Sequence, residues 1–137
     1  MIVLDTNVLS ELMKARPDAQ VGVWMQSIDE TVATTAITVM EIEYGLRRLP
    51  DGRRKVDLGH RFAALATVLT VMPLDDIAAY RAGQFRALRE AEGFAPHPSD
   101  MMIAGIAASA EARLATRNVK DFQGLPLQLV DPWRPHC

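Results

Sequence analysis

The chain has 137 residues, of which 49% are hydrophobic and 23% charged, with a net charge of −2 and a mean hydropathy of +0.03. These values are typical of one compact soluble domain, so we expect residues 1–137 to form a single domain, and they exclude a disordered tail or a two-domain enzyme. The only cysteine is Cys137, which excludes an intrachain disulfide and fits a reducing, cytoplasmic compartment. No basic leader precedes an apolar run and no apolar stretch approaches the roughly 20 residues of a membrane span, so we expect neither secretion nor membrane contact.

The chain opens with a pattern of strand, tight turn and helix. Residues 2–4 form an apolar run without alternation, which is typical of a strand buried on both faces of a parallel sheet. The polar residues 5–7 can cap a helix, and the apolar residues of 8–13 recur at helical spacing. A second helix is expected over 18–28, and the Thr- and Val-rich segment 31–37 predicts the next strand.

The middle of the chain predicts a helical hairpin. Thr38 followed three residues later by Glu41 matches a capping box, so we expect a helix to begin at Thr38. Residues 49–52 interrupt it, and a further helix is expected from about Val56.

Strands and helices continue to alternate in the second half. We expect a strand at 69–74, a helix capped by Asp75, an uncharged and therefore central helix between Asp100 and Glu111, and short strands at 113–116 and 127–130. On the Asp75-capped helix the expected apolar side is formed by Ile77, Tyr80, Phe85, Leu88 and Ala91. The fold class is therefore α/β, with a central parallel sheet of four to five short strands flanked by helices on both faces.

Polar residues follow the predicted strands at the edge where ligands of parallel sheets bind. Asp5 follows the first strand, Glu41 lies in the first helical turn after the second, and Asp100 opens the uncharged helix. Asn118 and Asp121 follow the fourth strand. Each of these residues taken alone could be only a helix cap or a first-turn acid, and that alternative stays open for each.

Carboxylates gathered at one sheet edge repel one another and raise each other's pKa values, so a compensating cation is expected. Oxygen ligands without His or Cys favour Mg²⁺ or Mn²⁺ over zinc or copper. Such ions activate water and stabilise charge on phosphoryl oxygens. The residues alone therefore predict metal-dependent phosphoryl chemistry.

Four segments in order resemble the PIN-domain ribonucleases, and most closely the VapC toxins of bacterial toxin–antitoxin pairs: MIVLDTNVLSEL, AITVMEIEYGL, SDMMIAGIA and ATRNVKDF. The segment PLQLVDPW favours the FitB-like subgroup. The resemblance implies a PIN-like fold and a Mg²⁺-dependent endoribonuclease toxin, with Mn²⁺ as a possible substitute, that hydrolyses RNA phosphodiester bonds. It also implies a cognate antitoxin, a homodimer and a toxin–antitoxin hetero-oligomer.

The same resemblance implies roles for individual residues. Asp5 and Asp100 become the principal metal ligands and Glu41 the third acid. Thr6 would orient a carboxylate or a metal-bound water.

The last motif departs from the family pattern. The family often has an acid where this chain has Asn118, so Asn118 and Asp121 are alternative candidates for the fourth polar position, with Thr116 in support. An uncharged Asn118 also leaves open a catalytically inactive domain that binds RNA or a partner. A magnesium-binding, receiver-like signalling module is a further alternative, although the expected acid pair after the first strand and a phosphoacceptor Asp after a middle strand do not occur.

A basic segment could guide RNA toward an acidic pocket, because Lys and Arg contacts to phosphate give sequence-independent affinity. A solvated helix face is the alternative. The candidate RNA-binding residues are Arg47, Arg48, Arg53, Arg54 and Lys55. His60, His97 and His136 show no metal-ligand spacing; His97 could touch substrate, and a loop histidine without a role is the alternative.

Overall fold

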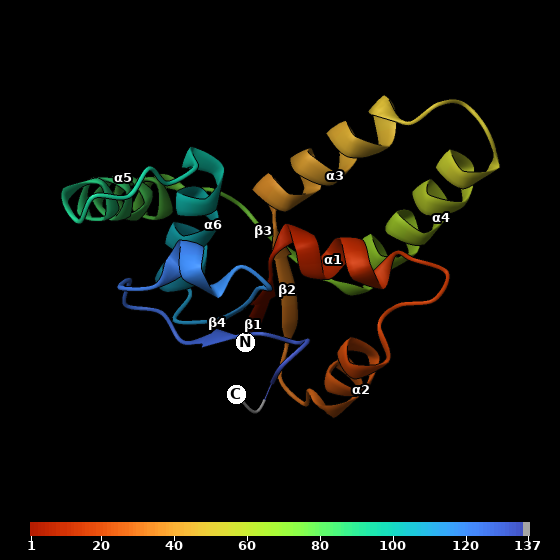
Figure 1. Ribbon diagram of the computed structural model, residues 1–137, viewed down its shortest axis with the longest axis horizontal. Helices are drawn as coiled ribbons and strands as arrows, with labels where there is room; N and C mark the ends of the chain where they lie inside the picture. Colours follow the sequence, from red (N-terminus) through yellow and green to blue (C-terminus); the bar gives the residue numbers. More distant parts are fainter. Residues whose placement is uncertain (136–137) are drawn as a thin grey trace.

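Five short parallel strands form one sheet at the centre of the protein (Figure 1). The computed structural model describes residues 1–135, so His136 and Cys137 lie outside the described residues. The strand order is β3-β2-β1-β4-β5, and every pairing is parallel. The strands are β1 Ile2–Leu4, β2 Val32–Thr35, β3 Thr70–Met72, β4 Arg113–Ala115 and β5 Leu129–Val130. The predicted α/β class with four to five short strands is confirmed.

Helices cover both faces of this sheet, as predicted (Figure 1). They are α1 Thr6–Leu12, α2 Ala19–Ser27, α3 Ala36–Arg48, α4 Arg53–Val68, α5 Asp76–Ala91, α6 Pro98–Ser109 and the 3-10 helix η1 Val119–Phe122. Val3 of β1 packs with Phe85 and Ile103 of α5 and α6, whereas the next residue, Leu4, packs with Trp24 of α2. Neighbouring residues of β1 thus bury opposite faces, which explains its unbroken apolar run. Within residues 1–135, no helix is long and apolar enough to cross a membrane.

Helices α3 and α4 form the predicted hairpin, which extends away from the sheet (Figure 1). Ile42 of α3 packs with Leu9 of α1, and Leu58 and Phe62 of α4 lie against this cluster. α4 begins at Arg53, three residues before the expected start, directly after the turn.

The predicted start of α3 is wrong. Thr35, rather than Thr38, caps the helix: its hydroxyl accepts the main-chain N–H of Thr38 at 3.0 Å. Strand β2 also ends at Thr35, because Thr35 still pairs with Met72 of β3, so the helix begins at Ala36. Glu41 is therefore not part of a capping box and is free to contact another element.

The predicted buried side of α5 is confirmed for Phe85 and wrong for the other four residues. Ile77 and Tyr80 are 58% and 75% exposed, and Leu88 is exposed as well. The buried residues of α5 are Ala78, Ala82, Phe85 and Arg89. The reason is a close approach by α6: a Cβ added at Gly105 would lie 2.4 Å from the carbonyl oxygen of Ala78, so small residues must face α6 there.

Candidate active site

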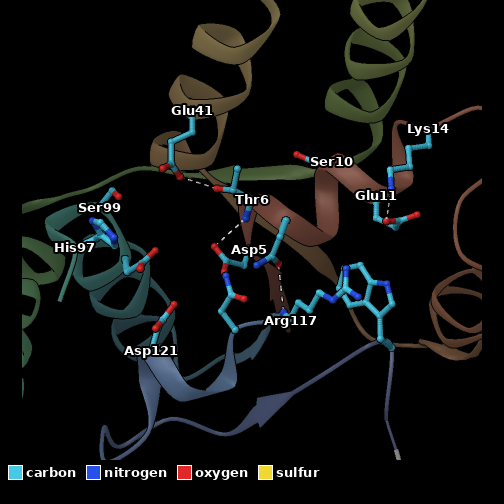
Figure 2. Close-up of a pocket in the computed structure, with 14 residues that line it drawn as sticks. Asp5, Thr6, Ser10, Glu11, Lys14, Glu41, His97, Ser99, Arg117 and Asp121 are labelled. Atoms are coloured by element: carbon cyan, nitrogen blue, oxygen red, sulfur yellow. Dashed lines mark hydrogen bonds and ion pairs between the residues drawn. The ribbon is translucent and has the colours of Figure 1, made fainter. Parts of the chain in front are cut away.

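A pocket of about 650 Å³ opens at the carboxyl edge of the sheet, beside the ends of β1 and β4. It gathers polar side chains from α1, α3, α6 and the segment after β4. Those predicted from the sequence are Asp5, Thr6, Glu41, Asp100, Asn118 and Asp121. In Figure 2, Glu41 and Asp121 lie on opposite sides of Asp5. Residues spread over more than a hundred positions of the sequence are therefore brought into one pocket.

Asp5 lies at the centre of a buried hydrogen-bond network. It is 4% exposed; its Oδ1 accepts the N–H of Thr6 at 2.8 Å, and its Oδ2 accepts the hydroxyl of Thr116 at 2.7 Å. Thr116 Oγ1 in turn accepts the main-chain N–H of Asn118 at 3.1 Å. Burial raises the pKa of Asp5 and the two hydrogen bonds oppose this, while the charges of Glu41 and Asp121 raise it further. Asp5 thus caps α1, as the helix-cap alternative predicted. Its carboxylate also lines the pocket.

Asp100 has a strongly raised pKa. It lies in the first turn of α6, which begins at Pro98 rather than at Asp100 itself. Burial, followed by the charges of Asp5 and Asp121, raises the pKa of Asp100 to about 6, and His97 opposes the rise. The pocket therefore concentrates negative charge that its own cations do not balance.

Glu41 reaches the pocket from α3 and is held by α1. The hydroxyl of Thr6 donates to Glu41 Oε1 at 2.6 Å and also lies 3.2 Å from the hydroxyl of Thr38 (Figure 2). Thr6 thus orients a carboxylate across two helices.

Asn118 and Asp121 occupy different positions around η1. Asn118 precedes the helix, and its side chain makes no capping hydrogen bond. Asp121 lies within η1, and its charge raises the pKa values of both Asp5 and Asp100. The guanidinium of Arg89, buried on α5, donates to the carbonyl oxygens of Lys120 at 3.0 Å and Gln123 at 2.6 Å, which flank Asp121. The sequence analysis missed Arg89, although an arginine within the buried stripe of a helix was a signal for it.

None of the five basic residues of the candidate RNA-binding segment lines this pocket. Arg47 pairs with Glu43 at 2.7 Å and Lys55 with Asp51 at 3.3 Å. Arg53 and Arg54 line a separate groove between α1 and α4. The pocket's own full cations are Lys14 and Arg117, which the sequence analysis did not select. Arg117 follows β4 directly, so the strand-end argument that found Asn118 could have found it.

The donor set fits a hydrated hard cation. The acids offer only oxygen atoms as ligands. Burial and, after it, repulsion from the other acids raise the pKa of Asp100, and a divalent cation would relieve that repulsion. Within residues 1–135, no three acidic, His or Cys side chains stand close enough together to chelate an ion directly. Mg²⁺ typically uses one or two carboxylates and keeps several waters, so such spacing suits it better than it suits zinc.

Comparisons with known proteins identify the family of the chain. The PIN domain family matches residues 2–125. The chain is 35% identical to "VapC ribonuclease Y4jK" of Sinorhizobium fredii, covering 98% of this chain and 99% of that protein. It is 32% identical to "Toxin FitB" of Neisseria gonorrhoeae, covering 97% and 99%. The solved structure "Structure of FitAB bound to IR36 DNA fragment" superposes with a TM-score of 0.89 at 31% identity, over 97% of this chain and 96% of that one. With its strand-edge pocket of acids and these matches over almost its whole length, the chain belongs to the PIN-domain family, among the relatives of VapC and FitB.

Proposed function

We propose that this protein is the toxin of a type II toxin–antitoxin pair and an endoribonuclease that hydrolyses RNA phosphodiester bonds, with Mg²⁺ as its ion and Mn²⁺ as a substitute. The observation that carries the proposal is the meeting of Asp5, Glu41, Asp100 and Asp121 in one pocket, where burial and then the charges of the other acids raise the pKa of Asp100 to about 6. The similarity to proteins named VapC ribonuclease and FitB toxin supports it.

Within this pocket we assign Asp5 and Asp100 as the principal metal ligands and Glu41 as the third acid. A bound divalent ion would supply charge neutralisation at a phosphate and activation of water. Thr116 and Thr6 fix the carboxylates of Asp5 and Glu41 through hydrogen bonds of 2.7 and 2.6 Å. These carboxylates are thus oriented before substrate binds.

For the fourth polar position we favour Asp121 over Asn118. Asp121 acts electrostatically on both Asp5 and Asp100, and Arg89 fixes the main chain around it. A complete set of acids favours an active nuclease over an inactive binding domain. The strand order β3-β2-β1-β4-β5 also differs from the 2-1-3-4-5 order of receiver domains, which argues against the signalling alternative.

We propose that a cognate antitoxin binds the groove between α1, α3 and α4. This groove of about 250 Å³ has an apolar floor and shares four lining residues with the acidic pocket: Thr6, Ser10, Lys14 and Glu41. Its apolar lining is Met13, Ile42, Leu46, Leu49 and Leu58. A segment lying there can place a cationic side chain near the acids, so antitoxin and metal should compete.

The remaining assignments follow from this function. Strands from both ends of the chain share one sheet, so we propose that residues 1–137 act as a single PIN domain. The activity belongs in the cytoplasm, where it meets RNA. A homodimer and a toxin–antitoxin hetero-oligomer stay predictions.

Expression in a bacterial host tests the proposal. The wild-type chain alone is expected to stop growth, whereas Asp5→Asn is expected to be harmless at equal protein levels. Co-expression of the small protein encoded beside its gene should restore growth and co-purify with the chain. Harmless expression of well-folded wild-type protein, with no co-purifying neighbour, would reject the toxin assignment.

A further inference from the structure

A stacked arginine–tryptophan pair lies at the rim of the acidic pocket. The guanidinium carbon of Arg117 is 4.7 Å from the ring centroid of Trp133, and both residues line the pocket. Arg117 extends away from Asp121 in Figure 2, so its charge is displaced from the acids at the pocket's centre. The pair is thus placed to meet a substrate that continues beyond that centre.

Both partners are anchored independently. The main-chain N–H of Arg117 donates to Asn7 Oδ1 at 3.3 Å, and that of Trp133 donates to Asp131 Oδ1 at 2.9 Å. The Trp133 side chain also packs on the core cluster that contains Leu4 and Trp24. Stacking on the face of a fixed indole restricts the movement of the guanidinium. The N–H groups at the edge of the guanidinium stay free to donate hydrogen bonds.

The positive charge of Arg117 is also not paired with a carboxylate of residues 1–135. Lys14, the other full cation of the pocket lining, pairs with Glu11 at 2.9 Å. Among residues 1–135, no carboxylate lies within 4.0 Å of the Arg117 guanidinium. RNA is a polyanion that the pocket's acids repel, so an unpaired cation beside them lowers the cost of bringing a phosphate near.

We infer that Arg117 binds a phosphate of single-stranded RNA adjacent to the phosphodiester held at the acids, and that Trp133 is a positioning residue that holds the guanidinium for this contact. The inference rests on the proposed nuclease function, because it assigns that function's substrate path. It moves the principal RNA contact from the basic segment at 47–55 to the rim of the pocket itself.

RNA binding is measured in an Asp100→Asn background, so that cleavage does not interfere, by fluorescence anisotropy with a short single-stranded RNA of mixed sequence. Arg117→Gln is expected to weaken binding about tenfold, the loss typical of a charged hydrogen bond. It should also lower the slope of log affinity against log salt by about 0.7, the value for one phosphate contact. Trp133→Leu should weaken binding and Trp133→Phe should restore most of it. Arg81→Gln, which removes an exposed arginine of α5 outside the pocket lining, is the matched control and should change neither quantity.

The same substitutions in the active chain separate this inference from the nuclease function. Arg117→Gln should raise KM about tenfold with kcat changed less than about twofold, because the contact is made equally in the ground and transition states. Cleavage by the wild type with KM and RNA affinity independent of Arg117 would overturn the inference and leave the nuclease intact. Arg117-dependent RNA binding by a chain that never cleaves would keep the inference and reject the nuclease. Absence of RNA binding altogether, or a loss of antitoxin binding alone in Arg117→Gln, would overturn the inference.

Discussion

Asp100→Asn is expected to stabilise the metal-free fold while destroying its activity, and the gain should depend on pH. In the folded chain the pKa of Asp100 is about 6, against 3.8 for an unperturbed Asp. Between these values the folded chain binds more protons than the unfolded chain, so wild-type stability falls as pH rises from 4 to above 6. The difference between the two pKa values corresponds to about 3 kcal/mol. An amide does not titrate, so the stability of Asp100→Asn does not fall with pH for this reason.

Urea denaturation of wild type and Asp100→Asn at pH 4 and pH 7.5, both with chelator, measures the effect. Because an unperturbed Asp is already more than half ionised at pH 4, the advantage of the variant should grow by about 2.4 kcal/mol between the two pH values. Asp29→Asn, which removes an exposed carboxylate outside the pocket, is the matched control and should show no such growth. Adding Mg²⁺ at pH 7.5 should stabilise the wild type more than Asp100→Asn, because the ion binds only the folded site. A stability difference that is the same at both pH values would refute the account of Asp100 as a carboxylate held at an electrostatic cost.

Other substitutions test the remaining parts of the pocket and the helix pair behind it. Asp5→Asn is expected to abolish Mg²⁺-dependent cleavage of RNA in a gel assay, because an amide binds a hard cation less well than a carboxylate; undiminished activity would remove Asp5 from the site. Asp121→Asn should lower kcat more than Asn118→Ala does, and the reverse ranking would give the fourth polar position to Asn118. Gly105→Ala should lower the free energy of unfolding by about 1–3 kcal/mol, since its Cβ would meet the main chain of α5 at 2.4 Å. Gly83→Ala, where a Cβ meets open space, is its control, and equal denaturation midpoints for the two variants would contradict the close approach of α5 and α6.

Much of the pocket could be predicted from the sequence, because the position of these residues at the strand edge depends on topology rather than on local detail. A short apolar run in the sequence indicated strand β1, which Asp5 follows. Because the sheet is parallel, Asp5 must lie at the same edge as Asn118, which follows β4. The sequence therefore sufficed to bring distant acids together. It did not reveal the contact between Glu41 and Thr6, because the capping box assigned Glu41 to a different partner.

The errors in the start of α3 and in the buried side of α5 arise where a local sequence pattern is compatible with two structures. Thr35 and Thr38 can each cap a helix, and strand pairing with Met72, which no local pattern contains, decides for Thr35. The buried side of α5 was set by the distance to Gly105 of α6, whereas the hydrophobic pattern favoured its larger side chains. Helical periodicity predicts a buried face only when the neighbouring helix leaves room for it.

Charge posed a different difficulty. The basic residues of 47–55 are conspicuous in the sequence, yet Arg47 and Lys55 are each paired with an acid four residues earlier in the chain. Arg117 is a single arginine in a short motif, and only the three-dimensional structure shows it stacked on Trp133 beside the acids. The position of a cation relative to the pocket matters more here than the local density of basic residues.

In the proposed function, the acids of this pocket would hold a divalent ion, and the chain cleaves RNA only with that ion bound. The most direct measurement is the cleavage of end-labelled RNA by the purified chain, freed of antitoxin, across a titration of Mg²⁺ and with a chelator in excess. We expect internal cleavage that rises with Mg²⁺, disappears with chelator and is absent in Asp5→Asn. Cleavage that persists in chelator and in Asp5→Asn, or a folded chain that binds Mg²⁺ and leaves every RNA intact, would contradict it.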